Sequence, residues 1–473
     1  MRAWIGALAV VVCGCARGEQ LDDVAGGPSA GSQGGVTAGG SGAGSDGGGG
    51  SASTGGTDAR AGGATSAGGT ANVGDGSGGA GGHESSSGGA ADAGDASAGG
   101  MTANGGTTAS AGGSTANGGT ATAGGAASTG GASACTTVPG VPGSTRTPTR
   151  KIKDLTGTGT SSGAFGVGGT ALGIPVRQPN GKIAYVFGDT FDDDRAHGTG
   201  WRAPVLLRSE PGFDADGIDF DGAAGGTRAK QILDYAHDNQ TSWLPSDAIT
   251  IGSRMYLHYI VNQGLGNVQW TQIAYSDDGG ETWTSSDARW EANENDGLRQ
   301  LWTWERGCDG YVYVLSTKFI TRDRPIILHR VPEEKILDKS AYEPWGWDGS
   351  TWAWGHPASV VLDGAFGELS LRRIEDKWVL SWFNAGAYEI TIKVFDSPTS
   401  NLYDAHTYHP LLGTDWCSEN DTHVAQLYGG YIHPDSTLHE LHLIVSQWST
   451  SAGPCHPNPD SPYHAMEFVT GVE

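Results

Sequence analysis

The chain has 473 residues and 80 glycines, and 40 of these glycines fall within residues 21–134, a segment without Phe, Tyr or Trp. Such a segment cannot bury enough apolar surface to offset its ordering entropy, so one globular fold over the whole chain is excluded. Residues 135–473 carry 43 acidic and 25 basic side chains, a net charge of −18. This acidity argues against nucleic acid as a partner and favours neutral partners.

The chain begins MRAWIGALAVVVCGCARGEQ, with one Arg before an apolar run too short to cross a bilayer as a helix. This pattern predicts a signal peptide over residues 1–14. The residues before Cys15 are similar to the lipidation site of bacterial lipoproteins, so we expect a lipid on Cys15 that anchors the chain in the cell envelope. If the cell has an outer membrane, we expect the protein there. The alternative is ordinary signal cleavage nearby.

Residues 15–134 predict a disordered, lipid-anchored linker. Blocks such as Ala-Gly-Gly, Thr-Gly-Gly and Ala-Asn-Gly-Gly recur in this segment. Gly-rich chains of this kind behave as flexible coils, and glycine here lacks the strict period of three that collagen requires. The simplest function is a tether that holds the folded domain, residues 135–473, away from a membrane.

Four cysteines remain after cleavage at Cys15, and in an exported domain they suggest two disulfides with three alternative pairings. We favour Cys417–Cys455, because both flank the last predicted strands, and Cys135–Cys308 would then pin the start of the domain. No CxxC or close His spacing accompanies these cysteines. We therefore expect no metal site and no cofactor.

Short apolar runs rich in β-branched and aromatic residues recur through the domain, separated by turn signals such as Asn180-Gly181 and Asp309-Gly310. No long segment has helical periodicity, and residues 332–341 allow at most a short helix. The length and spacing predict an all-β fold, and a propeller rather than a sandwich. The predicted strands are Ile183–Phe187, Met255–Ile260, Tyr311–Ser316, Ile326–Val331, Trp378–Trp382, Ile390–Phe395 and Leu441–Trp448.

The segment Ser276–Trp283 reads SDDGGETW and matches the Asp-box, S-x-D-x-G-x-T-W, of many propeller hairpins. Its Asp and Ser side chains can bond turn amides, and its glycines permit positive φ. We interpret this segment as a fold marker without a catalytic role.

Several longer segments resemble the domain-of-unknown-function family 4185. Residues 165–192 read FGVGGTALGIPVRQPNGKIAYVFGDTFD, similar to a G-T-D-L-G segment followed by a strand ending F-G-D-T-F. Further similar segments are FGELS at 366–370, QLYGGYIHP at 426–434 and SQW at 446–448. The resemblance spans roughly residues 150–470 and implies a five-bladed propeller, and glycoside hydrolase activity on D-arabinan.

Glycoside hydrolysis needs two carboxyl groups, one protonated and one ionised. Asp189 is the first candidate, because it follows the predicted strand Ile183–Phe187 and Gly188, where a turn can aim it out of the sheet. The alternative is an Asx-turn with Thr190.

Glu368 is the second candidate, since a glutamate that enters a buried strand is unusual unless paired or functional. Its alternative is a salt bridge to Arg372 or Arg373. Asp247 is a third, weaker candidate, because it too precedes an apolar run.

One departure from the family pattern bears on activity. This chain has Ala171 where the family shows aspartate, eighteen residues before Asp189. Alanine cannot transfer a proton, so three explanations stay open: a degenerate sugar-binding propeller, a carboxyl group supplied by Glu368 or Asp247, or an altered sequence.

The abundant tryptophans predict a surface that stacks against sugar rings, although most Trp in a propeller belong to the core. The residues that we predict to contact substrate are Trp243, Asn384, His433, Gln447 and Trp448.

Three functions compete: a surface-anchored hydrolase of neutral, furanosidic polysaccharide, an inactive sugar-binding propeller, and a sialidase. The sialidase is disfavoured because no Arg cluster for a substrate carboxylate is evident. We expect a monomer.

Overall fold

The computed structural model describes residues 146–473 except positions 237, 239 and 265. The predicted signal peptide, Cys15, the linker and Cys135 lie outside the described residues. Within the described part of the chain, no helix is long and apolar enough to cross a membrane.

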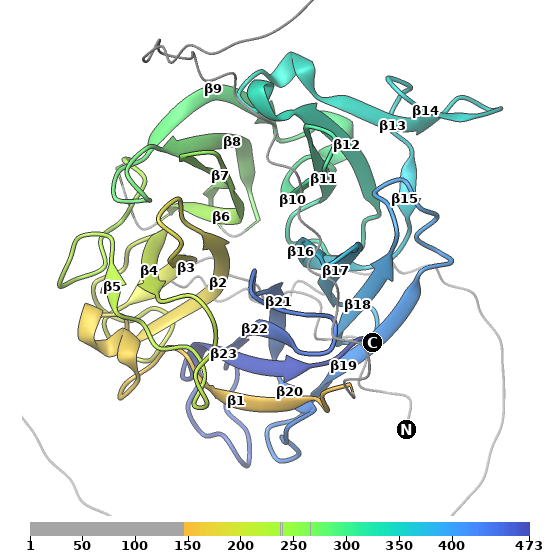
Figure 1. The fold of residues 1–473 in the computed structure, drawn as a ribbon. Helices are drawn as coiled ribbons and strands as arrows, with labels where there is room; N and C mark the ends of the chain where they lie inside the picture. The colour runs from red at the N-terminus through yellow and green to blue at the C-terminus, as the bar shows by residue number, and fades with distance from the viewer. Residues whose placement is uncertain (1–145, 237, 239, 265) are drawn as a thin grey trace, which may run out of the picture. The chain divides into compact units, whose positions relative to one another are not determined.

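Five sheets, built almost entirely from antiparallel pairs, form the blades of a propeller (Figure 1). Blade 1 consists of β2 (Gly169–Arg177), β3 (Ile183–Phe191), β4 (Val205–Ser209) and β5 (Gly222–Ala223). Blade 2 consists of β6 (Thr241–Ile251), β7 (Arg254–Gln263), β8 (Val268–Ser276) and β9 (Thr284–Glu291). Blade 3 consists of β10 (Leu301–Arg306), β11 (Tyr311–Thr317), β12 (Ile326–Pro332), β13 (Glu343–Trp347), β14 (Trp352–Trp354) and β15 (Val360–Leu362).

Blade 4 also carries a short parallel pair at its outer edge, and blade 5 combines strands from both ends of the domain. Blade 4 consists of β16 (Phe366–Ile374), β17 (Lys377–Asn384), β18 (Glu389–Phe395), β19 (His406–Thr414) and β20 (His423–Ala425). Blade 5 consists of β21 (Leu427–Ile432), β22 (Leu441–Trp448), β23 (Tyr463–Thr470) and β1 (Arg150–Asp154). The short 3-10 helices are η1 (Ser161–Phe165), η2 (Glu294–Gly297), η3 (Glu333–Lys335) and η4 (Lys339–Ala341).

The pairing of β1 with β23 closes the ring, because it joins the first and last strands of the domain in one sheet. The predicted five-bladed β-propeller is confirmed. Each predicted strand lies within an observed strand, and the short helix allowed at residues 332–341 appears as η3 and η4.

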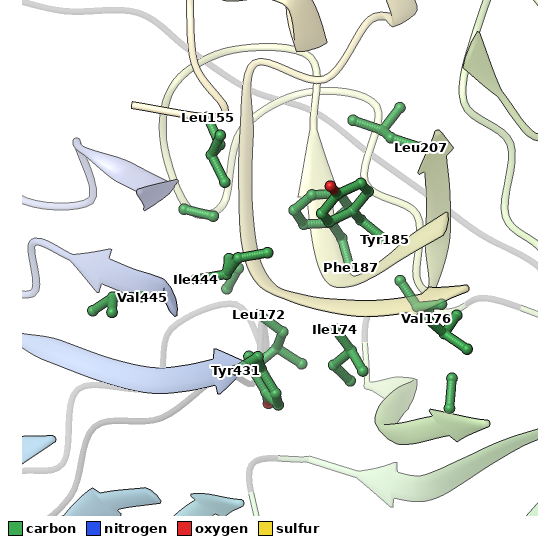
Figure 2. Close-up of a cluster of buried hydrophobic side chains, with 14 of the residues drawn as sticks. Leu155, Leu172, Ile174, Val176, Tyr185, Phe187, Leu207, Tyr431, Ile444 and Val445 are labelled. Atoms are coloured by element: carbon green, nitrogen blue, oxygen red, sulfur yellow. The ribbon is translucent and has the colours of Figure 1, made fainter. Parts of the chain in front are cut away.

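The core fills the spaces between neighbouring blades. Figure 2 shows the part between blades 1 and 5, where Leu172 and Ile174 of β2 lie near Tyr431, Ile444 and Val445 of blade 5. Because the inner strands are covered on both faces, their apolar runs are nearly continuous; every residue of β3 is buried. The outer strand β9 is largely exposed instead.

Side-chain hydroxyl groups bond the backbone across every interface between neighbouring blades. These bonds tie adjacent strands near the axis, where sheet hydrogen bonds cannot reach from one blade to the next. They are Thr250 Oγ1 to Arg177 O (2.6 Å), Ser246 Oγ to Trp302 O (2.9 Å), Leu371 N to Thr303 Oγ1 (2.6 Å), Ile432 N to Ser370 Oγ (3.0 Å) and Leu172 N to Ser446 Oγ (2.8 Å).

Asp247 lies mid-strand in β6 and forms a buried ion pair across the propeller axis. Arg372 of β16 donates from Nη2 to Oδ1 at 2.9 Å and from Nη1 to Oδ2 at 3.0 Å. Asp247 also accepts from Thr303 Oγ1 and from the amides of Trp304 and Ala248. Both carboxylate oxygens are therefore engaged, and Asp247 links blades 2, 3 and 4 in this structure. Its catalytic role stays a prediction.

The Asp-box forms the β8–β9 turn as predicted. Asp278 Oδ1 accepts from the amides of Glu281 and Thr282, and Ser276 Oγ accepts from the amide of Gly280. Trp283 is nearly buried and donates from Nε1 to Gly280 O at 3.1 Å.

The predicted disulfide between Cys417 and Cys455 is confirmed, with the two Cα atoms 5.2 Å apart. It joins the loop before β20 to the loop between β22 and β23. Cys308 is also disulfide-bonded, and Cys135, its predicted partner, lies outside the described residues.

We expect Asp247→Ala to lower the free energy of unfolding by about 3–5 kcal/mol, because it leaves the Arg372 guanidinium buried without its charge partner. Denaturant titration of purified protein measures this loss. Asp277→Ala, which breaks the exposed Arg254–Asp277 pair in the same blade, is the matched control and should change stability little. Unchanged stability of Asp247→Ala, together with lost activity, would contradict the structural role.

Candidate functional site

One end of the blades gathers most of the predicted site residues. We call this end the rim: it is where the innermost strands β2, β6, β10, β16 and β21 begin and where the antiparallel second strands end. The predicted residues at the rim are Asp189, Trp243, Glu368, Asn384, Gln447 and Trp448. The loops 192–204, 224–236, 318–325, 415–422 and 449–462 also lie at this end.

His433 lies at the opposite end, because it follows the last residue of β21. Its side chain is buried, and Nε2 is 2.9 Å from the hydroxyl oxygen of Tyr185 near the start of β3. The structure therefore does not bring His433 to the other predicted substrate contacts. Sequence alone could not separate the two ends, because that requires the direction of each strand.

Asp189 is fully buried within β3, where the sequence predicted a turn. The strand continues to Phe191 because Thr190 pairs with Thr170 of β2 and with Arg202. Trp201 Nε1 donates to Asp189 Oδ1 at 2.7 Å, and Ser242 Oγ of β6 donates to the same oxygen at 2.9 Å. The Oδ2 atom has no hydrogen-bond partner among the described residues. The carboxyl group thus bridges blades 1 and 2 and does not cap its own loop.

Burial raises the pKa of Asp189 above its usual range. The hydrogen bonds from Trp201 and Ser242, and the nearby His197, lower this pKa but do not cancel the effect of burial. A carboxyl group with a raised pKa suits a proton donor in general acid catalysis.

Ala171 lies opposite Asp189 on the neighbouring strand. The register passes from Thr170↔Thr190 to Leu172↔Phe187, so β3 carries one extra residue beside Ala171. A second irregularity follows at Leu172, whose φ of 77° is unusual for a bulky residue. Bulges of this kind re-aim side chains and are common beside active sites. An aspartate at position 171 would be an immediate neighbour of Asp189.

Glu368 is a second buried carboxyl group at the rim, and a strand irregularity lies here too, between Phe366 and Leu369. Its Oε1 accepts from Arg322 Nη2 at 2.7 Å, and Oε2 has no partner among the described residues. The alternative to a catalytic role for Glu368 is a salt bridge to Arg372 or Arg373. The structure shows an ion pair, but the partner of Glu368 is Arg322. Arg322 comes from the β11–β12 loop, 46 residues away, and sequence offered no signal for it.

Aromatic rings adjoin Asp189. Trp243 is half-buried at the start of β6 and stacks on Tyr235, with ring centroids 4.5 Å apart, and on Tyr259 at 5.1 Å. Trp201 stacks on Phe191. Trp243 is therefore a fixed aromatic surface in the strand that also supplies Ser242.

Trp448 ends β22 at the rim, and its ring centroid is 6.0 Å from that of His197. His197 belongs to the same loop as Trp201 and lies 3.5 Å from Asp460. Sequence analysis did not single out His197, because an isolated histidine in an acidic loop carries no spacing signal.

Asn384 and Gln447 are engaged in local hydrogen bonds. Asn384 donates to Thr391 Oγ1 and Glu389 Oε1 and accepts from the amide of Ala387. Gln447 donates to Glu419 Oε1 at 2.6 Å and lies 2.8 Å from His464 Nε2. These two side chains order the rim loops in this structure.

Among residues 146–473 without 237, 239 and 265, no group of three or more His, Cys, Asp or Glu side chains could hold a metal ion.

Comparison with known sequences identifies the family. Residues 156–468 match DUF4185, a domain of unknown function, and the chain belongs to this family. "Notoamide biosynthesis cluster protein J'" of Aspergillus versicolor is 34% identical over 336 residues, which cover 64% of this chain and 87% of that protein. An uncharacterized 35.9 kDa protein of Mycolicibacterium smegmatis is 28% identical and covers 67% and 97% of the two chains.

Among solved structures, a GH43_1 enzyme from Xanthomonas citri has a TM-score of 0.41 and 11% identity, and the match covers 68% of this chain and 91% of that one. Similarity at this level transfers neither a substrate nor a mechanism.

The raised pKa of Asp189 gives a pH dependence of stability. The pKa of Asp189 in the unfolded state is near 3.8, and above this pH the native state keeps a proton that the unfolded state releases. Asp189 therefore lowers the free energy of unfolding as the pH rises towards its pKa in the folded state. Asp189→Asn removes this loss. Over that pH range we expect the free energy of unfolding of the variant, relative to that of the wild type, to increase by about 1.4 kcal/mol per pH unit.

Urea titrations of both proteins from pH 4 to 8 measure the difference. Asp277→Asn, at an exposed carboxylate of blade 2, is the control for a general charge effect. A difference between wild type and Asp189→Asn that stays constant with pH would refute the raised pKa.

Proposed function

We propose that the rim is the active site of a glycoside hydrolase that cleaves a neutral, furanosidic polysaccharide of the D-arabinan type. The observation that carries the proposal is the pair of buried carboxyl groups, Asp189 and Glu368, at the same end of the blades. Burial raises the pKa of the first, and the second forms an ion pair with Arg322 at 2.7 Å. One protonated and one ionised carboxyl group are what glycoside hydrolysis needs.

In this mechanism Asp189 donates its proton to the departing glycosidic oxygen as the bond to the anomeric carbon breaks. Glu368 takes a proton from the water molecule that attacks the anomeric carbon, so the water supplies the new hydroxyl group. Glu368 then releases this proton to solvent and Asp189 takes one up, so both groups return to their starting states. Trp243 is stacked on Tyr235 and Tyr259, so this half-buried ring would contact a sugar ring through its edge.

Both carboxyl groups are covered in this structure, with Trp201 hydrogen-bonded over Asp189. Substrate contact therefore requires the 192–204 loop, which carries Trp201 and His197, to move aside. Loop rearrangement that completes a site on substrate binding is common in enzymes.

The second candidate function is sugar binding without cleavage. The covered carboxyl groups and Ala171, which stands where the family pattern has aspartate, favour this alternative. The name of the Aspergillus relative refers to a biosynthesis cluster, so membership of the family does not by itself identify arabinan as substrate.

If the propeller is a weakened hydrolase, Ala171→Asp should raise arabinan cleavage by at least about a hundredfold, because it places a second carboxyl group beside Asp189. Adding Asp189→Asn to this variant should abolish the gain and leave sugar binding largely intact. Product sizing after incubation of the whole protein with D-arabinan measures cleavage.

Ala171→Asn has a similar size without the ionisable group and is the matched control. If the wild type already cleaves arabinan, Glu368→Gln should inactivate it. A folded Ala171→Asp variant with unchanged cleavage, or an active enzyme indifferent to Asp189→Asn, would refute the assignment.

We also propose that the protein is a lipoprotein, held in the cell envelope through Cys15, and that it is a monomer. The lipid anchor rests on the N-terminal sequence alone. Mass spectrometry of the mature protein should find a lipid-modified N-terminal Cys15, and Cys15→Ser should abolish the modification while Cys13→Ser preserves it. An unmodified mature N-terminus at another residue would exclude the anchor.

A further inference from the structure

A tryptophan-rich hairpin projects from the outer edge of blade 3 (Figure 1). It is formed by β13 and β14, whose register pairs Trp345 with Trp354 and Trp347 with Trp352. Residues directly opposite each other in an antiparallel pair share a face, as do residues two apart along a strand. All four indole rings therefore lie on one face of the hairpin.

The other face of the hairpin carries small residues and is covered by the following chain. Gly346 pairs with Ala353 on this face, and a Cβ atom at Gly346 would clash with the backbone of Pro357. Ser359 fixes this chain to the hairpin, because its amide donates to Trp345 O and its Oγ accepts from Trp347 N. The hairpin therefore presents only its indole face.

The four rings differ in exposure along the hairpin. Trp345 and Trp354 pack on the blade core, and the guanidinium of Arg330 lies between Trp354 and Tyr311, 4.3 Å and 4.2 Å from their ring centroids. Trp347 and Trp352, by contrast, are 45% and 38% exposed. Their centroids are 6.1 Å apart, and Trp352 also stacks on Trp345 at 6.0 Å. The inner pair anchors the hairpin, and the outer pair faces solvent.

The turn of the hairpin is rigid and acidic. Asp348 Oδ1 accepts from the amides of Ser350 and Thr351 and from Ser350 Oγ. These hydrogen bonds lower the pKa of Asp348 to about 2, so it is ionised at physiological pH. His356 Nε2 lies 3.8 Å from Asp348 Oδ2. The outer tryptophans are thus held beside a hydrated carboxylate and two hydroxyl side chains.

We propose that this hairpin is a second carbohydrate-binding site that holds a neutral polysaccharide chain away from the rim. Indole faces stack against the C–H faces of sugar rings, and Asp348, Ser350 and Thr351 offer hydrogen bonds to sugar hydroxyl groups. Large exposed apolar side chains that a rigid turn holds in place mark an interaction site rather than a packing surface. This inference does not depend on catalysis at the rim.

The charges at the hairpin select against other partners. An ionised Asp348 at the tip opposes insertion into a bilayer, where a buried carboxylate is costly. Arg330 is paired with Glu343 at 2.8 Å, so no unpaired cation of the hairpin attracts phosphate or an acidic polysaccharide. A neutral, hydroxyl-rich chain fits both constraints.

The test uses the whole protein in affinity gels that contain arabinan, xylan or galactomannan, with dissociation constants from tryptophan fluorescence. We expect at least one of these polysaccharides to retard the wild type. Trp347→Ala/Trp352→Ala should weaken that binding at least tenfold, whereas Trp347→Phe/Trp352→Phe should retain part of it. Leu412→Ala, at a side chain 36% exposed on β19, is the matched control and should bind as the wild type does.

Asp189→Asn and Glu368→Gln should leave polysaccharide binding at the hairpin intact. These variants therefore distinguish a wrong proposal for the rim from a wrong proposal for the hairpin. Retardation by none of the three polysaccharides, or full retention by the double alanine variant, would overturn the proposal. The proposal would also be overturned if the wild type bound phosphatidylcholine vesicles and the double alanine variant did not, because the occupant would then be a lipid surface. Self-association in sedimentation velocity that the double alanine variant loses would overturn it too, because the occupant would then be a second copy of the chain.

Discussion

The buried ion pair between Asp247 and Arg372 is the interaction on which the arrangement of the blades depends. It joins the innermost strands of blades 2 and 4, which are not neighbours in the ring, and Arg372 also donates to Pro175 O of blade 1. One guanidinium thus sets the distance between three blades across the axis. Separating these strands would leave charges buried without partners, which is far more costly than stretching an apolar contact. Asp247 lies mid-strand in β6, so this link holds the blades at a distance from the strand starts that form the rim.

Both candidate carboxyl groups lie where the regular sheet is interrupted near the rim. Asp189 adjoins the bulge opposite Ala171, and Glu368 lies within the irregularity between Phe366 and Leu369. In a regular strand, alternate side chains would point into the space between blades and be covered by core residues. A bulge changes this alternation for one residue and can turn a polar group towards the axis without loss of the pairing on either side. The hydroxyl bonds between blades then fix the backbone on which these groups sit.

Sequence predicted the strands because they depend on local patterns of apolar runs and turn residues. The five-bladed ring followed from the family resemblance, and one disulfide was favoured among three pairings because its cysteines flank the last strands. The partners of the candidate groups could not be predicted, because they come from distant segments. Ser242 is 53 residues from Asp189, and Arg322 is 46 residues from Glu368. Asp247 and Asp189 both lie beside apolar runs, so sequence alone does not distinguish them. In the structure both carboxylate oxygens of Asp247 accept hydrogen bonds, whereas Oδ2 of Asp189 has no hydrogen-bond donor among the described residues. Likewise, the composition showed many tryptophans, but the β13–β14 register was needed to place four of them on one face.

In the proposed hydrolase, the residue at position 171 decides which carboxyl group can act together with Asp189. An aspartate there would be on the strand adjacent to Asp189, and carboxyl groups on neighbouring strands are close enough to raise each other's pKa by repulsion. With alanine, the pKa of Asp189 is raised by burial alone, and the nearest alternative carboxyl group in the proposal, Glu368, belongs to another blade. Carboxyl groups separated by about 6.5–9.5 Å leave room for a water molecule and give inversion, whereas a spacing of about 5 Å gives retention. In the proposed mechanism an aspartate at residue 171 would therefore give Asp189 a partner on the adjacent strand, whereas Glu368 is a partner from another blade.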